Sequence, residues 1–177
     1  MKQHLHHPGC GCGVNLSRRG MFGLGLGAAV TAAFPALAAY GAYEAMLVNC
    51  IDPRFQTASW VYMAGRGLKD NYSQFTIAGG PIGVVAPAFV DWQKTFWDNL
   101  GITVQLHSIK RVVGITHRDC GAAFVAYGEA LRTDKGLELA KQSEALRQFR
   151  AEVGKRQPKL GVDTGIMGLD GVVEVIT

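Results

Sequence analysis

The sequence is poor in residues that bind transition metals or form disulfides, with four cysteines and five histidines among 177 residues. Acidic residues are missing altogether from the first 38 positions, so most of the formal net charge of +4 arises there. Residues 39–177 carry 15 Lys or Arg against 14 Asp or Glu. This balance excludes a strongly basic domain, and we therefore expect no nucleic-acid partner. The sequence also lacks internal repeats and low-complexity linkers, and its length suits one domain with a hydrophobic core.

The amino-terminal segment has the pattern of an export signal. The stretch SRRGMFG at 17–23 is typical of a twin-arginine signal, and an uncharged apolar run follows from position 21 to about 43. The small residues of ALA at 36–38 suit cleavage by a signal peptidase. We therefore expect a signal peptide over 1–38, the twin-arginine export machinery as a partner, and a periplasmic domain over 39–177. The alternative is a retained membrane anchor, because the apolar run is long enough to span a bilayer.

A cluster of histidine and cysteine, HLHHPGCGC, occupies positions 4–12 of this leader. Its composition suits a soft metal. The interpretation that we favour is an unstructured leader that is discarded with the signal peptide. Once the leader is set aside, the cysteines and histidines that remain are Cys50, His107, His117 and Cys120.

Strands and helices are predicted to alternate along residues 44–177. Short apolar runs predict strands over 44–50, 75–81 and 110–117, and two short strands around an Asp-Gly turn within 165–177. Helical spacing of apolar residues predicts helices over 57–67, 87–99, 103–108, 120–132 and 135–154, with Gly101 interrupting the second and third. This alternation predicts an α/β fold with a mostly parallel sheet flanked by helices.

Residues capable of chemistry follow three of the predicted strands. Cys50 ends the first, the Ala-Gly-Gly turn at 78–80 lies at the end of the second, and His117 ends the third. Ligands of open parallel sheets bind at the carboxyl ends of the strands. We therefore expect these three segments to meet at one edge of the sheet.

The spacing of His117 and Cys120 within THRDCGAA (116–123) allows an imidazole and a thiolate to bind one metal ion where a strand turns into a helix. The predicted helix start should lower the pKa of the Cys120 thiol. Cys50 would complete a Cys₂His set, a catalytic zinc arrangement with an open fourth position. Two alternatives remain open here. One is a histidine cap beside a buried cysteine, and the other is a Cys50–Cys120 disulfide.

CIDPRF (50–55), AGG (78–80) and THRDCGAA (116–123) together resemble the β-class carbonic anhydrases, with their Cys-x-Asp-x-Arg and His-x-x-Cys signatures. The AGG turn and the short chain are most similar to the compact branch of that family first seen in archaea. GIMGLDGVV (165–173) resembles the family's strand-turn-strand near the carboxyl end. The resemblance implies the α/β fold of that family and one Zn²⁺ per chain, bound by Cys50, His117 and Cys120.

The resemblance also implies roles for residues around the metal. Asp52 and Arg54 correspond to the family's Asp–Arg pair. The carboxylate accepts a hydrogen bond from zinc-bound water or, once released, binds the metal itself, and the guanidinium holds it in place. The alternative is a surface ion pair worth less than about 1 kcal/mol. Gly79 and Gly80 are candidate substrate-binding residues, through close approach of the backbone, or form a plain turn. Asp119 is a candidate to orient His117 or to cap the following helix.

The activity that the resemblance implies is the reversible hydration of carbon dioxide to bicarbonate by zinc-bound hydroxide, in a homodimer or higher homo-oligomer. One alternative is a zinc-dependent hydrolase of CS₂ or COS on the same fold. Another is a non-catalytic module, stabilised by zinc or by a disulfide. The sequence departs from the family pattern at Ile77, where an asparagine is usual, and in the 66 residues between Cys50 and His117. Cleavage after position 38 would also leave almost no chain before the first strand, and this puts the geometry of any oligomer in question.

Overall fold

A computed structural model describes residues 41–177 of the chain. The expected export signal and the His- and Cys-rich segment at 4–12 lie outside the described residues. None of the helices in the described part is both long and apolar enough to cross a membrane.

The centre of the described domain is a five-stranded sheet in the order β2-β1-β3-β4-β5. Its strands are β1 Ala45–Asn49, β2 Tyr72–Thr76, β3 Arg111–His117, β4 Gly161–Met167 and β5 Val173–Val175. The first four strands run parallel, and β5 pairs with β4 in the antiparallel sense. The mostly parallel α/β fold predicted from the sequence is confirmed.

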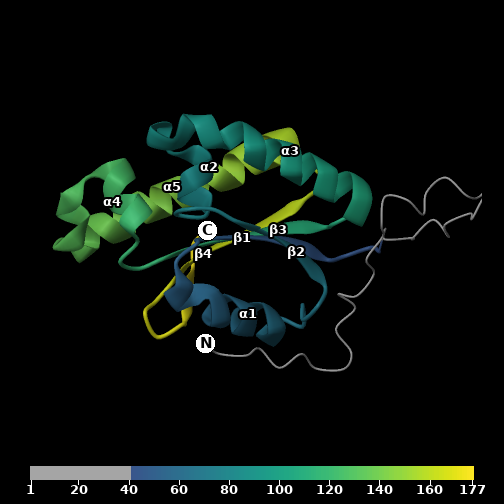
Figure 1. The fold of residues 1–177 in the computed structure, drawn as a ribbon, viewed down its shortest axis with the longest axis horizontal. Coiled ribbons are helices and arrows are strands. Elements are labelled where there is room, and N and C mark those ends of the chain that lie inside the picture. Colours follow the sequence, from purple (N-terminus) through teal and green to yellow (C-terminus); the bar gives the residue numbers. More distant parts are fainter. Residues whose placement is uncertain (1–40) are drawn as a thin grey trace, which may run out of the picture. The chain divides into compact units, whose positions relative to one another are not determined.

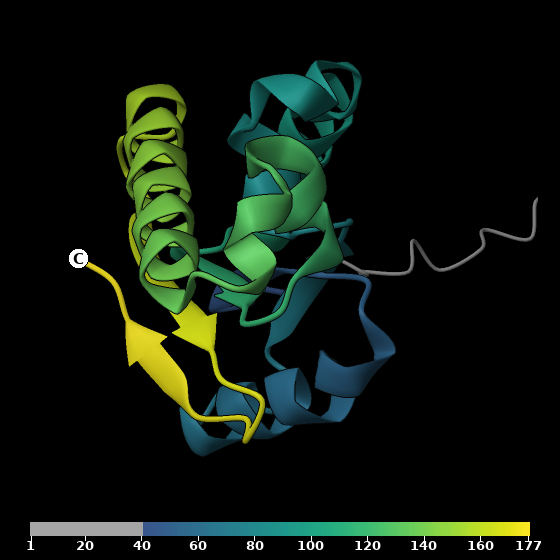
Figure 2. The same cartoon turned by 90° about the vertical axis from the view of Figure 1, so that its left-hand side faces the viewer.

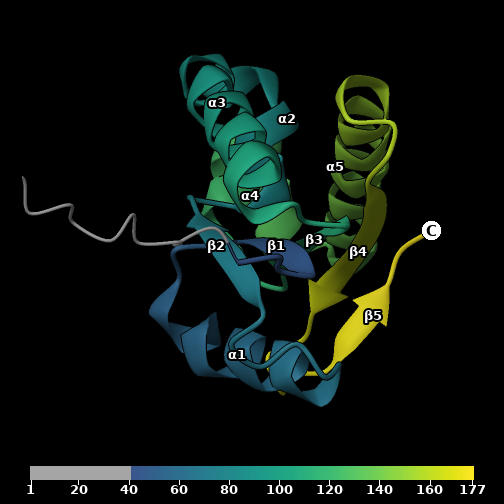
Figure 3. The same ribbon diagram turned by 90° about the vertical axis from the view of Figure 1, so that its right-hand side faces the viewer.

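Helices cover both faces of the sheet, as Figures 1 and 3 show. One face carries α1 (Gln56–Gly65), and the other carries α2, α3, α4 and α5. These four helices are α2 Pro81–Val85, α3 Val90–His107, α4 Gly121–Tyr127 and α5 Lys135–Arg156. Short 3-10 turns are η2 Pro53–Phe55, η3 Pro87–Phe89 and η4 Glu129–Arg132. Figure 2 shows the loop between β4 and β5 on the same side as α1, where a Cβ on Gly171 would lie 3.3 Å from that of Ala58.

The two central strands are buried because both of their faces are covered. Every residue of β1 is buried, and its side chains alternate between two cores. Val48 packs in the core under α3 and α5, which includes Phe149, whereas Leu47 packs with Met63 of α1. Gly114 of β3 makes room for this packing, because a Cβ there would lie 2.8 Å from the Phe149 ring.

Three predicted boundaries differ from the structure. The helix α3 is continuous, and the predicted interruption at Gly101 is wrong, because one glycine in a helix costs only about 1 kcal/mol and the flanking Leu100 and Thr103 are buried. β2 occupies 72–76 rather than 75–81, since Gly79 and Gly80 take positive φ values that end the extended chain. The predicted helix over 120–132 is divided into α4 and η4 at Gly128, where φ is 105°.

Candidate metal centre

Side chains from three segments meet at the carboxyl edge of the sheet. Cys50 follows β1, His117 is the last residue of β3, and Cys120 is the N-cap of α4. Their ligand atoms all lie within 4.8 Å of one another, and the residues are 6%, 2% and 0% exposed. Both cysteines are free thiols, so the alternative of a Cys50–Cys120 disulfide is not what the structure contains. The three residues that the sequence singled out are therefore brought together, and their binding of zinc remains a prediction.

The imidazole of His117 is oriented for metal binding. Its Nδ1 lies 2.8 Å from the carbonyl oxygen of Arg118, which can only accept, so Nδ1 carries the proton. Nε2 is buried and has no hydrogen-bond partner. The ring stacks on Phe55 with centroids 4.0 Å apart. A metal-binding histidine usually donates its other N–H to a carbonyl or carboxylate, and an orphaned buried nitrogen beside two thiols fits that role.

The two thiols affect each other's pKa in opposite directions. The neighbouring Cys120 thiol lowers the pKa of Cys50, against the opposing effect of burial. The neighbouring Cys50 sulfur, together with burial, raises the pKa of Cys120. The backbone amides at the start of α4 lower the pKa of Cys120, as expected from the sequence, but the neighbouring Cys50 sulfur and burial outweigh them, so the pKa is raised.

Asp52 and Arg54 form the predicted ion pair beside this group. Arg54 Nε lies 3.1 Å from both carboxylate oxygens of Asp52, and Nη2 lies 2.7 Å from Oδ2. The Asp52 carboxylate also accepts from the Arg54 backbone amide at 3.0 Å, with Pro53 fixing the backbone between them at the start of η2. The Arg54 hydrogen bonds lower the pKa of Asp52. Asp52 Oδ2 lies 3.9 Å from Nε2 of His117, so the carboxylate is placed against the candidate metal ligands.

Asp119 has a contact that the sequence did not suggest. Its carboxylate accepts from Arg54 Nη1 at 2.9 Å, and its carbonyl oxygen accepts from Nη2 at 3.1 Å. The N-cap of α4 is Cys120 and has no side-chain hydrogen bond. The Asp119 side chain thus binds Arg54 and neither caps the helix nor orients His117.

Gly79 and Gly80 form a tight turn against the metal-binding segment. The Gly79 amide donates to Cys50 Sγ at 3.2 Å. Gly80 has a φ of 55°, and a Cβ there would lie 2.8 Å from the Ile115 carbonyl oxygen. The structure thus requires glycine at position 80 for packing, and substrate binding by either residue remains a prediction.

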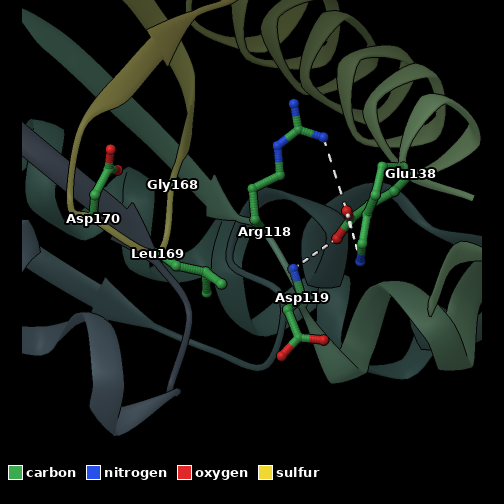
Figure 4. Close-up of a pocket in the computed structure, with 7 residues that line it drawn as sticks. Arg118, Asp119, Glu138, Gly168, Leu169 and Asp170 are labelled. Carbon is green, nitrogen blue, oxygen red and sulfur yellow. Dashed lines mark hydrogen bonds and ion pairs between the residues drawn. The ribbon is translucent and has the colours of Figure 1, made fainter. Parts of the chain in front are cut away.

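Buried polar side chains of α5 support the loop between His117 and Cys120. Glu138 is fully buried and accepts from the Asp119 amide over 2.6 Å, a contact drawn in Figure 4. Gln142, one turn further on, donates to the His117 carbonyl oxygen over 2.9 Å. The sequence analysis missed both residues. The sequence does contain a pattern that could have indicated them. The two polar residues are spaced i, i+4 and share the side of the predicted helix that carries the apolar Leu146 and Phe149.

Two cavities are lined in part by residues next in sequence to the candidate ligands. One, of about 410 Å³, is lined by Ile51, Thr76, Ile77, Ala78, Asp91, Trp92 and Thr95, next in sequence to Cys50 and Gly79. The other, of about 520 Å³, is lined by Arg118, Asp119, Lys135, Glu138, Gly168, Leu169 and Asp170 and is shown in Figure 4. His107 lies elsewhere, near the amino ends of the strands, with Nδ1 2.6 Å from Ser73 Oγ.

Solved structures with a similar fold include β-carbonic anhydrases. An enzyme from Sordaria macrospora, described as tetrameric, matches with a TM-score of 0.54 and 16% identity, over 81% of this chain and 85% of that one. A Coccomyxa β-carbonic anhydrase in complex with acetazolamide matches with a TM-score of 0.52 and 16% identity, over 81% and 76%. The described domain therefore has the β-carbonic anhydrase fold.

Relatives by sequence include two rickettsial proteins, both described as uncharacterized. The protein of Rickettsia conorii is 34% identical over 131 residues, which cover 74% of this chain and 70% of that protein. The protein of Rickettsia bellii is 32% identical over 131 residues, covering 74% and 80%. The chain belongs to the same family as these two proteins. No family model matches the sequence.

Proposed function

We propose that the protein is a carbonic anhydrase, a zinc lyase that interconverts carbon dioxide and bicarbonate with one Zn²⁺ per chain. The observation that carries this proposal is the unpartnered, buried Nε2 of His117 beside two free thiols and the Asp52–Arg54 pair. Cys50, His117 and Cys120 would hold the metal.

The ligand set suits catalysis better than a purely structural site. Structural zinc sites in proteins are usually closed by four protein ligands, whereas catalytic sites keep one position open. Only three candidate ligands lie in this group. Zinc held by these residues would act as a Lewis acid and bring the pKa of a bound water to about 7, which would prepare that water to attack the carbon of CO₂.

The protein's own groups then have separate tasks. The Asp52 carboxylate accepts a hydrogen bond from the attacking water and so orients it. Arg54 keeps that carboxylate from occupying the open position, because its guanidinium engages both oxygens of Asp52. The Gly79 amide stabilises the Cys50 thiolate. The Gly80 amide donates to the Ile77 carbonyl oxygen. Because both glycine amides already have acceptors within the protein, we propose that these glycines serve the substrate by letting it approach the backbone closely.

Carbon dioxide is the substrate that we favour. It is small, linear and apolar, and the cavity beside Cys50 offers it the side chains of Ile51, Ile77 and Trp92. CS₂ and COS share this shape, and a direct assay separates the three. A non-catalytic zinc-binding module on this fold would bind the metal and turn over none of them.

The biological setting is also proposed. We assign the chain to the compact, archaeal-type branch and to the periplasm, through the twin-arginine signal read in the sequence. A homodimer or higher homo-oligomer is supported by exposed apolar residues near the Cys50 cavity, with Ile51 59%, Val90 62% and Trp92 39% exposed.

The test is CO₂ hydration, measured by stopped flow on zinc-replete protein of known metal content. Cys120→Ser and His117→Ala should abolish both zinc retention and activity. His107→Ala is the matched control, because His107 lies at the opposite edge of the sheet, and this variant should keep both properties. Parallel assays of sulfide release from CS₂ and COS identify a sulfur substrate. A zinc-replete wild type that turns over none of the three substrates would contradict the proposal.

A further inference from the structure

We propose that Asp119 is a positioning residue of the metal centre, which joins the loop after β1 to the loop after β3 through Arg54 and is itself held by Glu138. This inference rests on the metal site proposed above, but it does not depend on turnover or on the identity of the substrate.

Arg54 spans the two segments that carry the candidate metal ligands. It belongs to the segment that begins with Cys50, and it binds Asp119, the residue before Cys120. One guanidinium therefore engages Asp52 on its own segment and both the carboxylate and the carbonyl of Asp119 on the other. These are charge-assisted bonds of 2.7 to 3.1 Å. The stacking of Phe55 on His117, with ring centroids 4.0 Å apart, also joins the two segments.

Asp119 makes this contact in an uncommon backbone conformation. Its φ is 58°, in the left-handed region, which aspartate and asparagine tolerate better than other non-glycine residues. Glu138 stabilises this conformation because its carboxylate accepts a hydrogen bond from the Asp119 amide at 2.6 Å. Figure 4 shows the result: the amide points toward Glu138 and the carboxylate points away from it. Residues in such conformations persist when their surroundings hold them, and they cluster at functional sites.

The support from α5 reaches a metal ligand as well. Glu138 accepts a hydrogen bond from the Asp119 amide. Gln142, on the next turn of the same helix, donates a hydrogen bond to the His117 carbonyl oxygen. The remaining oxygen of Glu138 has no hydrogen bond, but Arg118 and Lys135 lie 3.8 and 3.5 Å from it and balance its charge. The helix α5 thus fixes the backbone on both sides of Arg118, and Arg54 binds the carboxylate and the carbonyl oxygen of Asp119 in the same loop.

This arrangement should matter for metal binding far more than for folding. The Arg54 and Asp119 side chains are 50% and 44% exposed, and exposed ion pairs contribute little to stability. A preorganised ligand set, in contrast, depends on the groups behind it, and loss of an outer partner typically weakens metal affinity by about 10- to 100-fold.

The experiment measures binding of Co²⁺ to the full chain carrying Cys10→Ser and Cys12→Ser, so that the leader adds no thiolate signal. The readouts are the thiolate-to-cobalt charge-transfer absorption and the melting temperature of the metal-free protein. Asp119→Asn keeps tolerance of the left-handed conformation but removes the charge that Arg54 binds. We expect its Kd for cobalt to rise by about 10-fold or more. The matched control is Asp163→Asn, which makes the same change in a 2.6 Å pair with Arg66, at 39% exposure of the Asp163 side chain and away from the centre. The control should bind cobalt like the wild type.

A double-mutant cycle separates this role from a general loosening of the loop. Asp119 acts through Arg54, so Asp119→Asn should have little further effect on cobalt affinity in an Arg54→Met background. Equal affinities for Asp119→Asn and Asp163→Asn, or full additivity with Arg54→Met, would overturn the proposal while leaving the metal site intact. Absence of charge-transfer absorption from the Cys10→Ser/Cys12→Ser chain with an otherwise unchanged sequence would overturn the metal site, and this inference with it.

Discussion

The backbone amide of Gly79 donates a hydrogen bond to Cys50 Sγ over 3.2 Å. This contact links the turn after β2 to the sulfur of a candidate metal ligand. It explains why the glycine turn and the cysteine lie together, whatever substrate the site takes. A hydrogen bond to a charged acceptor is roughly twice as strong as one between neutral groups.

The neighbouring glycine tests how closely this turn must pack. Gly80→Ala would place a Cβ 2.8 Å from the Ile115 carbonyl oxygen and 3.0 Å from the Asn49 carbonyl carbon, at a φ of 55°. We expect a loss of about 1–3 kcal/mol in the free energy of unfolding, measured with urea. The control is Gly65→Ala in α1, where nothing lies within 4 Å of the new Cβ, and which should stabilise by about 0.4–1 kcal/mol. Equal stability of the two variants would refute this account of the turn.

Metal binding should stabilise the folded protein. A ligand that binds only the folded state adds about 2.7 kcal/mol when it is present at 100 times its Kd. We therefore expect zinc to raise the melting temperature and a chelator to reverse the rise. His117→Ala should abolish the shift, because it removes the only candidate nitrogen ligand in the group, whereas His107→Ala should retain it. A zinc-induced shift of the same size in His117→Ala would show that the metal binds elsewhere.

Asp52 should affect the rate more than the metal content. The carboxylate is not needed to hold zinc if three other ligands do so, but a positioned proton acceptor typically contributes about 10²- to 10⁴-fold to a rate. Asp52→Ala should therefore lower kcat for CO₂ hydration by about 10²-fold or more while retaining one zinc per chain. Stopped-flow assays with metal analysis on the same samples measure both. An unchanged kcat would leave Asp52 as a partner of Arg54 only.

Glu44 provides a test of pH dependence away from the metal centre. Its carboxylate lies 2.9 Å from Lys110 Nζ and 3.1 Å from an Arg111 nitrogen. The hydrogen bond from Lys110, and after it the Arg111 contacts, lower the pKa of Glu44 below its ordinary value of 4.5. Because the folded-state pKa is the lower one, the stabilisation is present above 4.5 and is lost as the pH falls through the folded value.

The measurement compares urea unfolding of wild type and Glu44→Gln from pH 7 down to about pH 3. Wild type should be the more stable at pH 7, and the difference should shrink below pH 4.5. A difference that is constant across the range would mean that the charge of Glu44 has no part in it.

The strands and the candidate ligands could be predicted because the sheet is parallel and covered on both faces. Strands in such a sheet are continuous apolar runs, and these runs are visible at β1 and β3. Cys50 and His117 are conspicuous because each stands at the end of one. The helix α2 was missed for the opposite reason. All five residues of PIGVV are buried, so the segment has no polar face to show a helical period.

The contacts behind the ligands could not be predicted from local patterns. Arg54 and Asp119 are 65 residues apart, and their pairing depends on how two loops approach each other across the edge of the sheet. Glu138 lies in a helix rich in charge, where a carboxylate looks like part of the solvated face. Only the fold shows that it is fully buried and that the Asp119 amide is its partner.

The pairing of β1 with β3 also has a kinetic consequence. Cys50 and His117 are separated by 66 residues and become neighbours only because the strands that carry them pair directly in the sheet. Closing so long a loop is entropically costly, and non-local pairings of this kind form slowly. An unfolded chain thus offers a metal ion at most the His117–Cys120 half of the site. In the Cys10→Ser/Cys12→Ser chain, the growth of thiolate-to-cobalt absorption during refolding would therefore time the joining of the two central strands.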